Sequence, residues 1–208
     1  MIYSITVYLV SVIQSKEDYL YYLEADRLSL GITKKTPPFF GYEIWKFERL
    51  LRKVEYYKNC RKGFFSNLYL FFLKWQFHNL SVKYIFHIEP NVCGPGLALH
   101  FNLVGIHGAA QIGANCLIQS GVNIGTKAGE SSSVPKIGDN VYIGPGAKIF
   151  GDITIADGIA IGANAVVNKS FLEPGISIGG IPAKKISDKG SEGLIIKGTD
   201  LADALLRS

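Results

Sequence analysis

Two histidines, His100 and His107, stand seven residues apart in the stretch GLALHFNLVGIHGAAQIG at residues 96–113, where short aliphatic repeats begin. The chain has only four histidines, so half of them lie in this stretch. An imidazole has an ordinary pKa near neutrality and can take a proton from a hydroxyl at physiological pH. Either histidine could therefore be a general base, or both could be packing residues, and the elements that hold them must decide.

The cysteines offer no competing chemistry. Cys60, Cys93 and Cys116 are odd in number and have no paired short spacing, so we expect free, buried thiols and no disulfide framework. This usage is typical of a reducing compartment, and we expect a cytoplasmic protein.

Composition indicates a globular chain. Of 208 residues, 48% are hydrophobic and 19% charged, which allows one large domain or two small ones. The net charge of +5 is modest, and its basic excess gathers in residues 46–63. We interpret that stretch as a solvated helix face or the rim of a site for an anionic cofactor, and we expect no nucleic-acid partner.

Two apolar runs are candidates for membrane contact. MIYSITVYLVSVIQS at the N-terminus is apolar for about thirteen residues, which is too short to span a bilayer. It also lacks the basic region and cleavage site of a signal peptide. The second run, residues 64–77, is interrupted by Asn67, Lys74 and Gln76 and predicts a buried or interfacial helix. Peripheral membrane contact is compatible with this half.

The sequence changes character near residue 86. Residues 16–85 hold most of the aromatic residues and few glycines, and apolar positions recur at helical spacing, as at Tyr19, Tyr22 and Leu23. Gly31 and the prolines at 37–38 are plausible breaks. We therefore predict a small α-helical domain over residues 1–85.

A period of six dominates the second half. An aliphatic residue recurs at every sixth position, interrupted by one thirteen-residue step, and a small residue often follows it. Because one inward residue every six positions fits short strands joined by turns, the period predicts a solenoid of stacked coils with a continuous aliphatic core. We place it at residues 86–187, followed by a C-terminal tail at 188–208. The repeat positions are Ile106, Ile112, Ile118, Ile124, Ile137, Ile143, Ile149, Ile155, Ile161 and Val167.

These repeats resemble the hexapeptide-repeat acyltransferase superfamily, and within it serine acetyltransferase-like enzymes, including relatives from capsule and surface-polysaccharide loci. The resemblance is carried by YLEADRLSLG, GPGLALHF, QIGANCLIQSGVNIGT, PKIGDNVYIGPGAKIFGDITIADGIAIGANAVV and GGIPAKKI. It implies a mainly β fold, a left-handed parallel β-helix behind the helical domain. It also implies acetyl-CoA as co-substrate, no metal, and a homotrimer or a dimer of trimers.

The resemblance also implies roles for individual residues. The family's general base lies twelve residues before an aliphatic repeat position, and counting back from Ile112 reaches His100, whereas His107 is a turn or rim residue. The family's orienting aspartate is replaced by His87, so Glu89 is the nearest carboxylate and the expected substitute. Acetyl-CoA contacts are expected at Pro145 and Ala163, with Lys169 and Lys184 near its phosphates.

The acceptor is less defined by the sequence. Val134 stands where serine-specific enzymes have a histidine before PKI, which favours a hydroxyl of a sugar or polysaccharide precursor as acceptor. L-serine is the alternative, and the ending LADALLRS predicts no cysteine synthase complex. Two other classes stay open: a metalloenzyme like the γ-type carbonic anhydrases, and a non-catalytic scaffold. The loop between Ile124 and Ile137 is expected to wall the active site.

Overall fold

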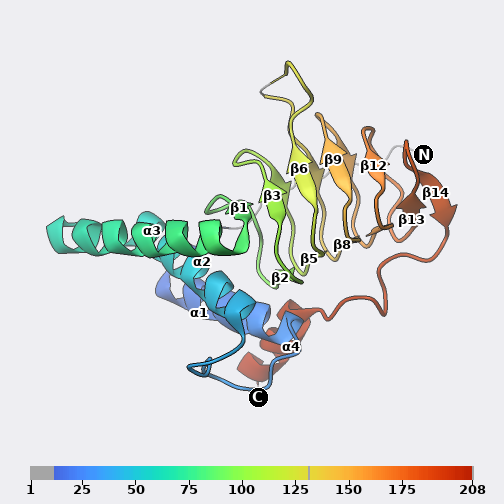
Figure 1. The fold of residues 1–208 in the computed structure, drawn as a ribbon. Helices are drawn as coiled ribbons and strands as arrows, with labels where there is room; N and C mark the ends of the chain where they lie inside the picture. Colours follow the sequence, from blue (N-terminus) through green and yellow to red (C-terminus); the bar gives the residue numbers. More distant parts are fainter. Residues whose placement is uncertain (1–11, 131, 208) are drawn as a thin grey trace.

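The computed structural model describes residues 12–130 and 132–207, so most of the apolar N-terminal run lies outside the described residues. Three helices come first and a fourth lies near the end of the chain (Figure 1). They are α1 (Lys16–Ser29), α2 (Glu43–Cys60), α3 (Phe64–Tyr84) and α4 (Gly198–Arg207). The side chain of Ser15 caps the start of α1 by accepting a hydrogen bond from the Asp18 amide at 2.9 Å.

Short strands fill the region between α3 and α4. Nearly all have two or three residues, as expected where a turn follows every few positions. They are β1 (Phe86–Ile88), β2 (Ala98–Leu99), β3 (Val104–Ile106), β4 (Gln111–Ile112), β5 (Leu117–Ile118), β6 (Asn123–Gly125), β7 (Lys136–Ile137), β8 (Tyr142–Ile143), β9 (Lys148–Phe150), β10 (Thr154–Ile155), β11 (Ala160–Ile161), β12 (Val166–Val167), β13 (Ser177–Gly179) and β14 (Lys184–Ser187).

The strands form a parallel β-helix with three sheets. Their orders are β1-β3-β6-β9-β12, β10-β7-β4 and β14-β13-β11-β8-β5-β2, and each coil of chain visits all three (Figure 1). Every pair of named strands is parallel except β13 with β14. The three corners where the chain passes from one sheet to the next therefore each form a column of stacked turns.

The predicted period of six is confirmed by the strand register. Ile106 pairs with Ile124, and Ile124 pairs with Ile149, so positions three repeats apart lie on top of each other except where the longer step intervenes. The repeat isoleucines are at most 1% exposed and form the core of the solenoid. The thirteen-residue step becomes a loop that projects from the corner between β6 and β7 (Figure 1).

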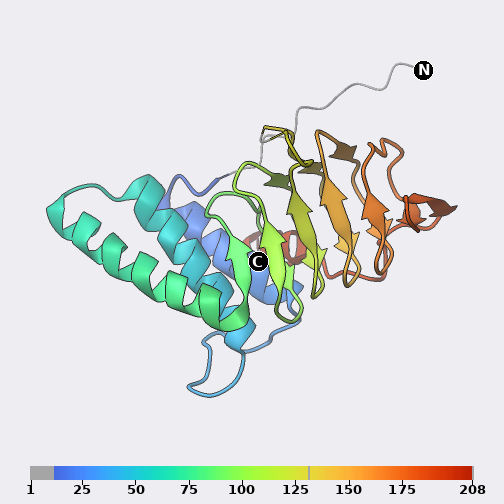
Figure 2. The same cartoon turned by 45° about the horizontal axis from the view of Figure 1, so that its top comes forward.

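The helices cover one end of the β-helix. Phe47 of α2 stacks on Phe77 of α3 with ring centroids 5.2 Å apart, and its ring lies 4.5 Å from that of Phe86 in β1. Figure 2 shows α2 and α3 running side by side from this end away from the solenoid. Aromatic packing therefore joins the helices to the first coil.

The C-terminal segment, which sequence reasoning treated as a tail, contains α4. The chain returns from the far end of the solenoid and α4 packs against α1 (Figure 1). The Gly198 amide donates to the Ser29 hydroxyl at 3.1 Å, and the Thr199 amide donates to the Asn115 side chain at 3.0 Å. This junction ties α1, α4 and the second coil together.

Candidate active site

One corner of the β-helix carries His100. The residues His100, Gln119, Gly144 and Gly162 each follow a strand of the six-stranded sheet, and each backbone amide donates to a carbonyl in the next coil at 2.8–3.0 Å. We call this column of four residues, together with the residue that follows each of them in the chain, the His100 corner. Because strands are about 4.8 Å apart, His100 and Gly162 lie about 14 Å from each other along it.

The His100 imidazole is half-buried and lies next to a side-chain amide. Nε2 of Gln119, one coil further on, is 3.5 Å from Nδ1 of His100. Burial lowers the pKa of His100 from its ordinary value of 6.5, because desolvation disfavours the charged imidazolium. The ring is therefore neutral at physiological pH and able to accept a proton.

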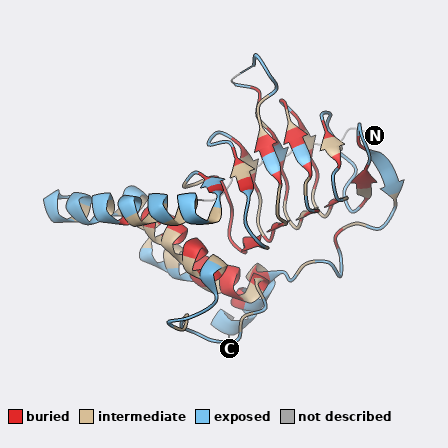
Figure 3. Ribbon diagram, in the orientation of Figure 1, coloured by how far each residue is buried: buried red, intermediate tan, exposed pale blue. Residues whose placement is uncertain are grey.

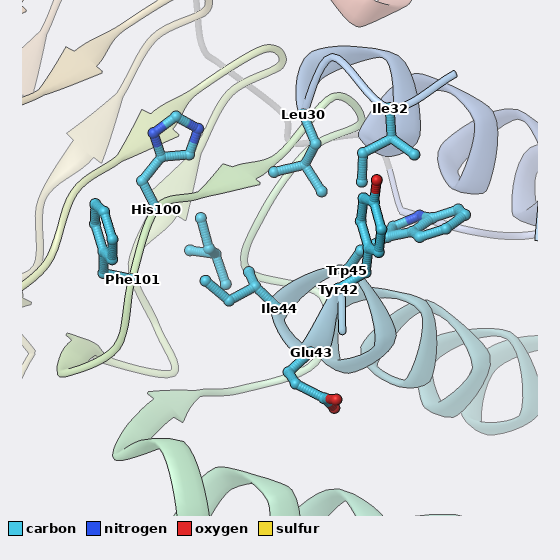
Figure 4. A pocket seen from close by; sticks show the side chains of 9 residues that line it. Leu30, Ile32, Tyr42, Glu43, Ile44, Trp45, His100 and Phe101 are labelled. Atoms are coloured by element: carbon cyan, nitrogen blue, oxygen red, sulfur yellow. The ribbon is translucent and has the colours of Figure 1, made fainter. Parts of the chain in front are cut away.

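A pocket of about 450 Å³ opens beside His100. Figure 4 shows His100 and Phe101 on one side and Tyr42 and Trp45 on the other, with aliphatic side chains between them. The lining contains one carboxylate, Glu43, and neither lysine nor arginine. Its walls are mainly apolar and come from the end of α1, the start of α2 and the first coil; the lining residues are Leu30, Ile32, Tyr42, Glu43, Ile44, Trp45, Leu99, His100 and Phe101.

The backbone turns sharply after His100. Phe101 and Leu103 adopt φ angles of 69° and 65°, in the left-handed region that side chains other than glycine rarely occupy. Such strained residues persist where the surrounding structure holds them, and they often gather at functional sites. The turn carries the chain from β2 to β3 and presents His100 at the mouth of the pocket.

Buried charged residues of α1 and α2 hold the chain that leads to His100. The Leu97 amide donates to Asp26 at 2.9 Å, and the Leu99 amide donates to Glu48 at 2.8 Å. Arg52 bonds to Asp26 at 2.7 Å and donates to the carbonyls of Cys93 and Gly94.

This network was not found from the sequence. Glu48, Arg52 and Glu55 recur at helical spacing on one face of α2, but nothing local reveals that this face is buried. Glu55 bonds to Arg52 at 3.0 Å and accepts from the Asn91 amide at 2.8 Å. Burial raises the pKa of Glu48 well above its ordinary value, and the charge of Asp26 adds to this. Burial therefore favours the neutral form of the Glu48 carboxyl, which limits the net negative charge of the network.

Glu89 lies at another corner of the same coil. It follows β1 and lines a separate pocket with His87 and Lys58, whereas His100 follows β2. In the described part of a single chain, the polar side chain that the structure places against a ring nitrogen of His100 is that of Gln119. The orienting role of Glu89 stays a prediction.

His107 lies at that other corner too. Its exposed ring accepts a hydrogen bond from the Ala109 amide at 3.2 Å within a turn. The loop between β6 and β7 leaves the solenoid at the same corner as His107, away from His100 of the same chain.

The predicted acetyl-CoA residues fall at two places. Pro145 and Ala163 are exposed members of the His100 corner, and Lys184 pairs with Gly179, which continues that column. Lys169 instead follows β12 at a different corner, where its ammonium lies 5.4 Å from the centre of the Phe171 ring.

Two of the three thiols are buried, and the described residues also answer whether metal-binding side chains gather. Burial raises the pKa of Cys116 to about 12, and it raises the pKa of Cys93 as well, so both thiols stay protonated. Over residues 12–130 and 132–207, no three His, Cys, Asp or Glu side chains gather as a metal would require.

Known proteins resemble this chain in sequence and in fold. The family "Bacterial transferase hexapeptide (six repeats)" matches residues 135–169. Serine acetyltransferase of Staphylococcus xylosus is 43% identical over 82 residues, which cover 38% of this chain and 37% of that protein. Over its repeat region the chain is thus similar to serine acetyltransferases and to the hexapeptide transferases. The match spans little more than a third of the Staphylococcus relative.

Solved structures extend the likeness to most of the fold. Serine acetyltransferase from Brucella abortus strain S19 has a TM-score of 0.66 at 24% identity, covering 85% of this chain and 72% of that one. The same Brucella protein has also been solved in complex with coenzyme A. Neisseria gonorrhoeae serine acetyltransferase in complex with serine has a TM-score of 0.62 at 25% identity, covering 83% and 71%. The predicted fold class, a left-handed parallel β-helix preceded by helices, is confirmed.

Proposed function

We propose that this serine acetyltransferase-like protein is an acetyl-CoA-dependent O-acetyltransferase in which His100 is the general base. The observation that carries the proposal is the position of His100: a neutral, partly desolvated imidazole at the junction of an open corner and a pocket. The corner offers a path for an extended donor, and the pocket offers a place for the acceptor.

The chemistry needs only one proton acceptor from the protein. Nitrogen of the His100 ring removes the proton of the acceptor hydroxyl as its oxygen bonds to the thioester carbonyl carbon. The carbon–sulfur bond then breaks, the acetyl group remains on the acceptor oxygen, and the proton held by His100 passes to the departing thiolate. The Gln119 amide, 3.5 Å from the ring, helps to hold the ring in place. No acyl-enzyme is required.

Acetyl-CoA fits the His100 corner as the donor. Pro145 and Ala163 expose a narrow, small-residue surface along the column, and Lys184 supplies a cation near its far end. The coenzyme A complex of the Brucella relative supports this class of donor. Lys169 lies at another corner and would contact the same donor only from a neighbouring copy.

L-serine is the acceptor that the relatives favour. The sequence had ranked a sugar hydroxyl first and L-serine second because of Val134, so this ranking is reversed. The Staphylococcus relative carries the name serine acetyltransferase, and the Neisseria structure is a complex with serine. A sugar hydroxyl is the second candidate, and one observation favours it. The lining of the His100 pocket has no lysine or arginine to pair with the carboxylate of an amino acid.

A trimer would complete this site. A neighbouring copy at the His100 corner could cover the donor and contribute cations that the pocket of a single chain lacks. Glu89, which a single chain keeps at another corner, would then have to act from that neighbour.

The deciding experiment is an acceptor screen that follows release of the CoA thiol. Purified protein is supplied with acetyl-CoA and either L-serine, simple hexoses or nucleotide-sugars, and His100→Ala is run beside the unaltered chain. Turnover of L-serine that depends on His100 supports the first candidate, and turnover of sugars alone supports the second. Turnover of neither class, or turnover that survives His100→Ala, contradicts the proposal.

A further inference from the structure

The helix α3 exposes an aromatic face along its length. Phe64, Phe71 and Trp75 are 78%, 72% and 56% exposed. Together with Leu68 and Val82, which are also exposed, they recur at steps of three, four and seven, so they share one side of the helix. We call these five residues the α3 outer face. The opposite side, with Leu73 and Phe77, packs against α2 and the solenoid core.

This face projects away from the rest of the molecule. Figures 1 and 2 show α3 extending beyond the β-helix, with the Phe64 end farthest from it. Figure 3 shows most of the helix surface as exposed. Aromatic residues clustered on an exposed helix usually meet a partner, because leaving them in water is costly.

Charge identifies the partner. Between Tyr56 and Ile88 the sequence has five basic residues and no aspartate or glutamate. The charge of this segment is therefore +5, the same as the net charge of the whole chain. All five are exposed, two on α3 itself and three just before it: Lys74, Lys83, Lys58, Arg61 and Lys62. The helix end that projects farthest is therefore both aromatic and cationic.

A second copy fits this surface poorly. Two copies that paired through the α3 outer face would bring their Lys and Arg side chains together with no carboxylate on this helix to compensate. An anionic lipid surface offers the complementary charge, and its interfacial region accepts Phe and Trp. No helix in the described part of the chain is both long and apolar enough to cross a bilayer.

We propose that α3 binds the surface of an anionic membrane, with its outer face in the interfacial region and its lysines near the lipid headgroups. The helix has 21 residues and is therefore about 31 Å long, so it can lie in the plane of the membrane over its whole length. This inference is independent of the reaction at His100.

The test is binding of the full-length chain to phosphatidylcholine vesicles with and without phosphatidylglycerol. We expect co-sedimentation with the anionic vesicles that weakens as salt is added. The double substitution Phe64→Ser with Phe71→Ser should lower the partition coefficient by at least about tenfold. Lys74→Glu with Lys83→Glu should abolish the preference for anionic lipid.

Matched controls come from the exposed loop before α2. Phe39 and Phe40 are 86% and 82% exposed, and Lys34 and Lys35 are exposed beside them. Phe39→Ser with Phe40→Ser, and Lys34→Glu with Lys35→Glu, make the same chemical changes away from α3 and should leave vesicle binding unchanged. Equal losses from both pairs of variants would overturn the assignment to α3.

Tryptophan fluorescence locates the contact. The chain has two tryptophans; Trp45 is buried at 1% exposure, so Trp75 should report contact with lipid. We expect anionic vesicles to shift the emission to shorter wavelength, brominated lipid to quench it, and Trp75→Phe to remove both effects. Protection of Trp75 from iodide in the free protein, with an oligomer that Phe64→Ser/Phe71→Ser disrupts, would instead show a second copy on this face and overturn the proposal. Failure to bind anionic vesicles would also overturn it.

Discussion

The Glu48 carboxyl oxygen lies 2.8 Å from the backbone nitrogen of Leu99, the residue that directly precedes His100. Both residues are buried, so this bond joins α2 to the chain that carries the candidate general base without competition from water. The position of His100 therefore depends on the helical half as well as on the β-helix.

Substitution of Glu48 should change activity through this bond. Glu48→Gln keeps an oxygen that can accept from the Leu99 amide, so kcat should stay close to that of the unaltered chain. Glu48→Ala leaves a buried amide without a partner, which costs about 1–3 kcal/mol of stability and should displace His100. We expect lower kcat in the folded fraction. An alanine variant that loses stability but keeps full kcat would show a purely structural role.

His100→Ala should remove the proton acceptor while leaving the fold intact. Loss of a general base lowers rates by about 10²–10⁴-fold, so kcat for acetyl transfer should fall within that range. His107→Ala is the matched control, because His107 is exposed in a turn at a different corner. Equal losses in the two variants would contradict the assignment, and circular dichroism would check that both fold.

The pH dependence of catalysis should report the desolvated imidazole. Burial lowers the pKa of His100 below its ordinary 6.5, so the ring loses its proton, and becomes an active base, at lower pH than a solvated histidine. In kcat/KM against pH we expect an acid limb with a midpoint below 6.5, absent in His100→Ala. A midpoint above 7 would mean that a nearby anion stabilises the imidazolium.

Arg52 should be essential for stability. Arg52→Met leaves Asp26 and Glu55 buried without their cation, and loss of one partner of a buried ion pair costs about 3–5 kcal/mol. Arg49→Met on the same helix is the control, since Arg49 is only partly buried and its guanidinium lies 5.5 Å from the Trp45 ring centre. In urea unfolding, the midpoint of Arg52→Met should lie at a clearly lower urea concentration than that of Arg49→Met. Similar midpoints would show that the network is dispensable.

Gly198 should be required for the docking of α4. A Cβ at this position would overlap the Ala25 carbonyl oxygen and the Ser29 hydroxyl, so Gly198→Ala must push α4 away from α1. We expect a loss of about 1–3 kcal/mol in stability and faster amide exchange in α4. Gly125→Ala serves as control, because a Cβ there meets only ordinary contacts. Unchanged exchange in α4 of the Gly198 variant would refute this.

The sequence predicted the solenoid well because its signal is local and repeated. Apart from the one thirteen-residue step, each repeat position lies six residues from the next and packs in the same core, so positions such as Ile118 and Ile143 were predicted without knowledge of the fold. The role of His100 came instead from the resemblance to hexapeptide-repeat acyltransferases, whose general base lies twelve residues before a repeat position, and it stays a prediction. The roles predicted for Glu89 and for the residues assigned to acetyl-CoA still await experiment.

The network of buried charged residues on α1 and α2 could not be predicted, because the residues that bond to each other are far apart in the chain. Asp26 accepts from Leu97, 71 positions away, and Glu48 accepts from Leu99, 51 positions away. From sequence alone, a charged residue on a helix is expected to be exposed to solvent, and only the packing of that helix face shows that it is buried. The pocket beside His100 was missed for the same reason, since α1, α2 and the first coil all contribute to it.

The antiparallel pairing of β14 has a consequence for self-association. A stack of parallel strands leaves an open edge at each end, and such an edge can recruit the strands of another molecule into a growing aggregate. Here α2 and α3 cover the first coil, and β14 closes the other end of the six-stranded sheet with Lys184 and Lys185. In the six-stranded sheet, open-ended growth is thus limited by elements that do not share the period of the repeat.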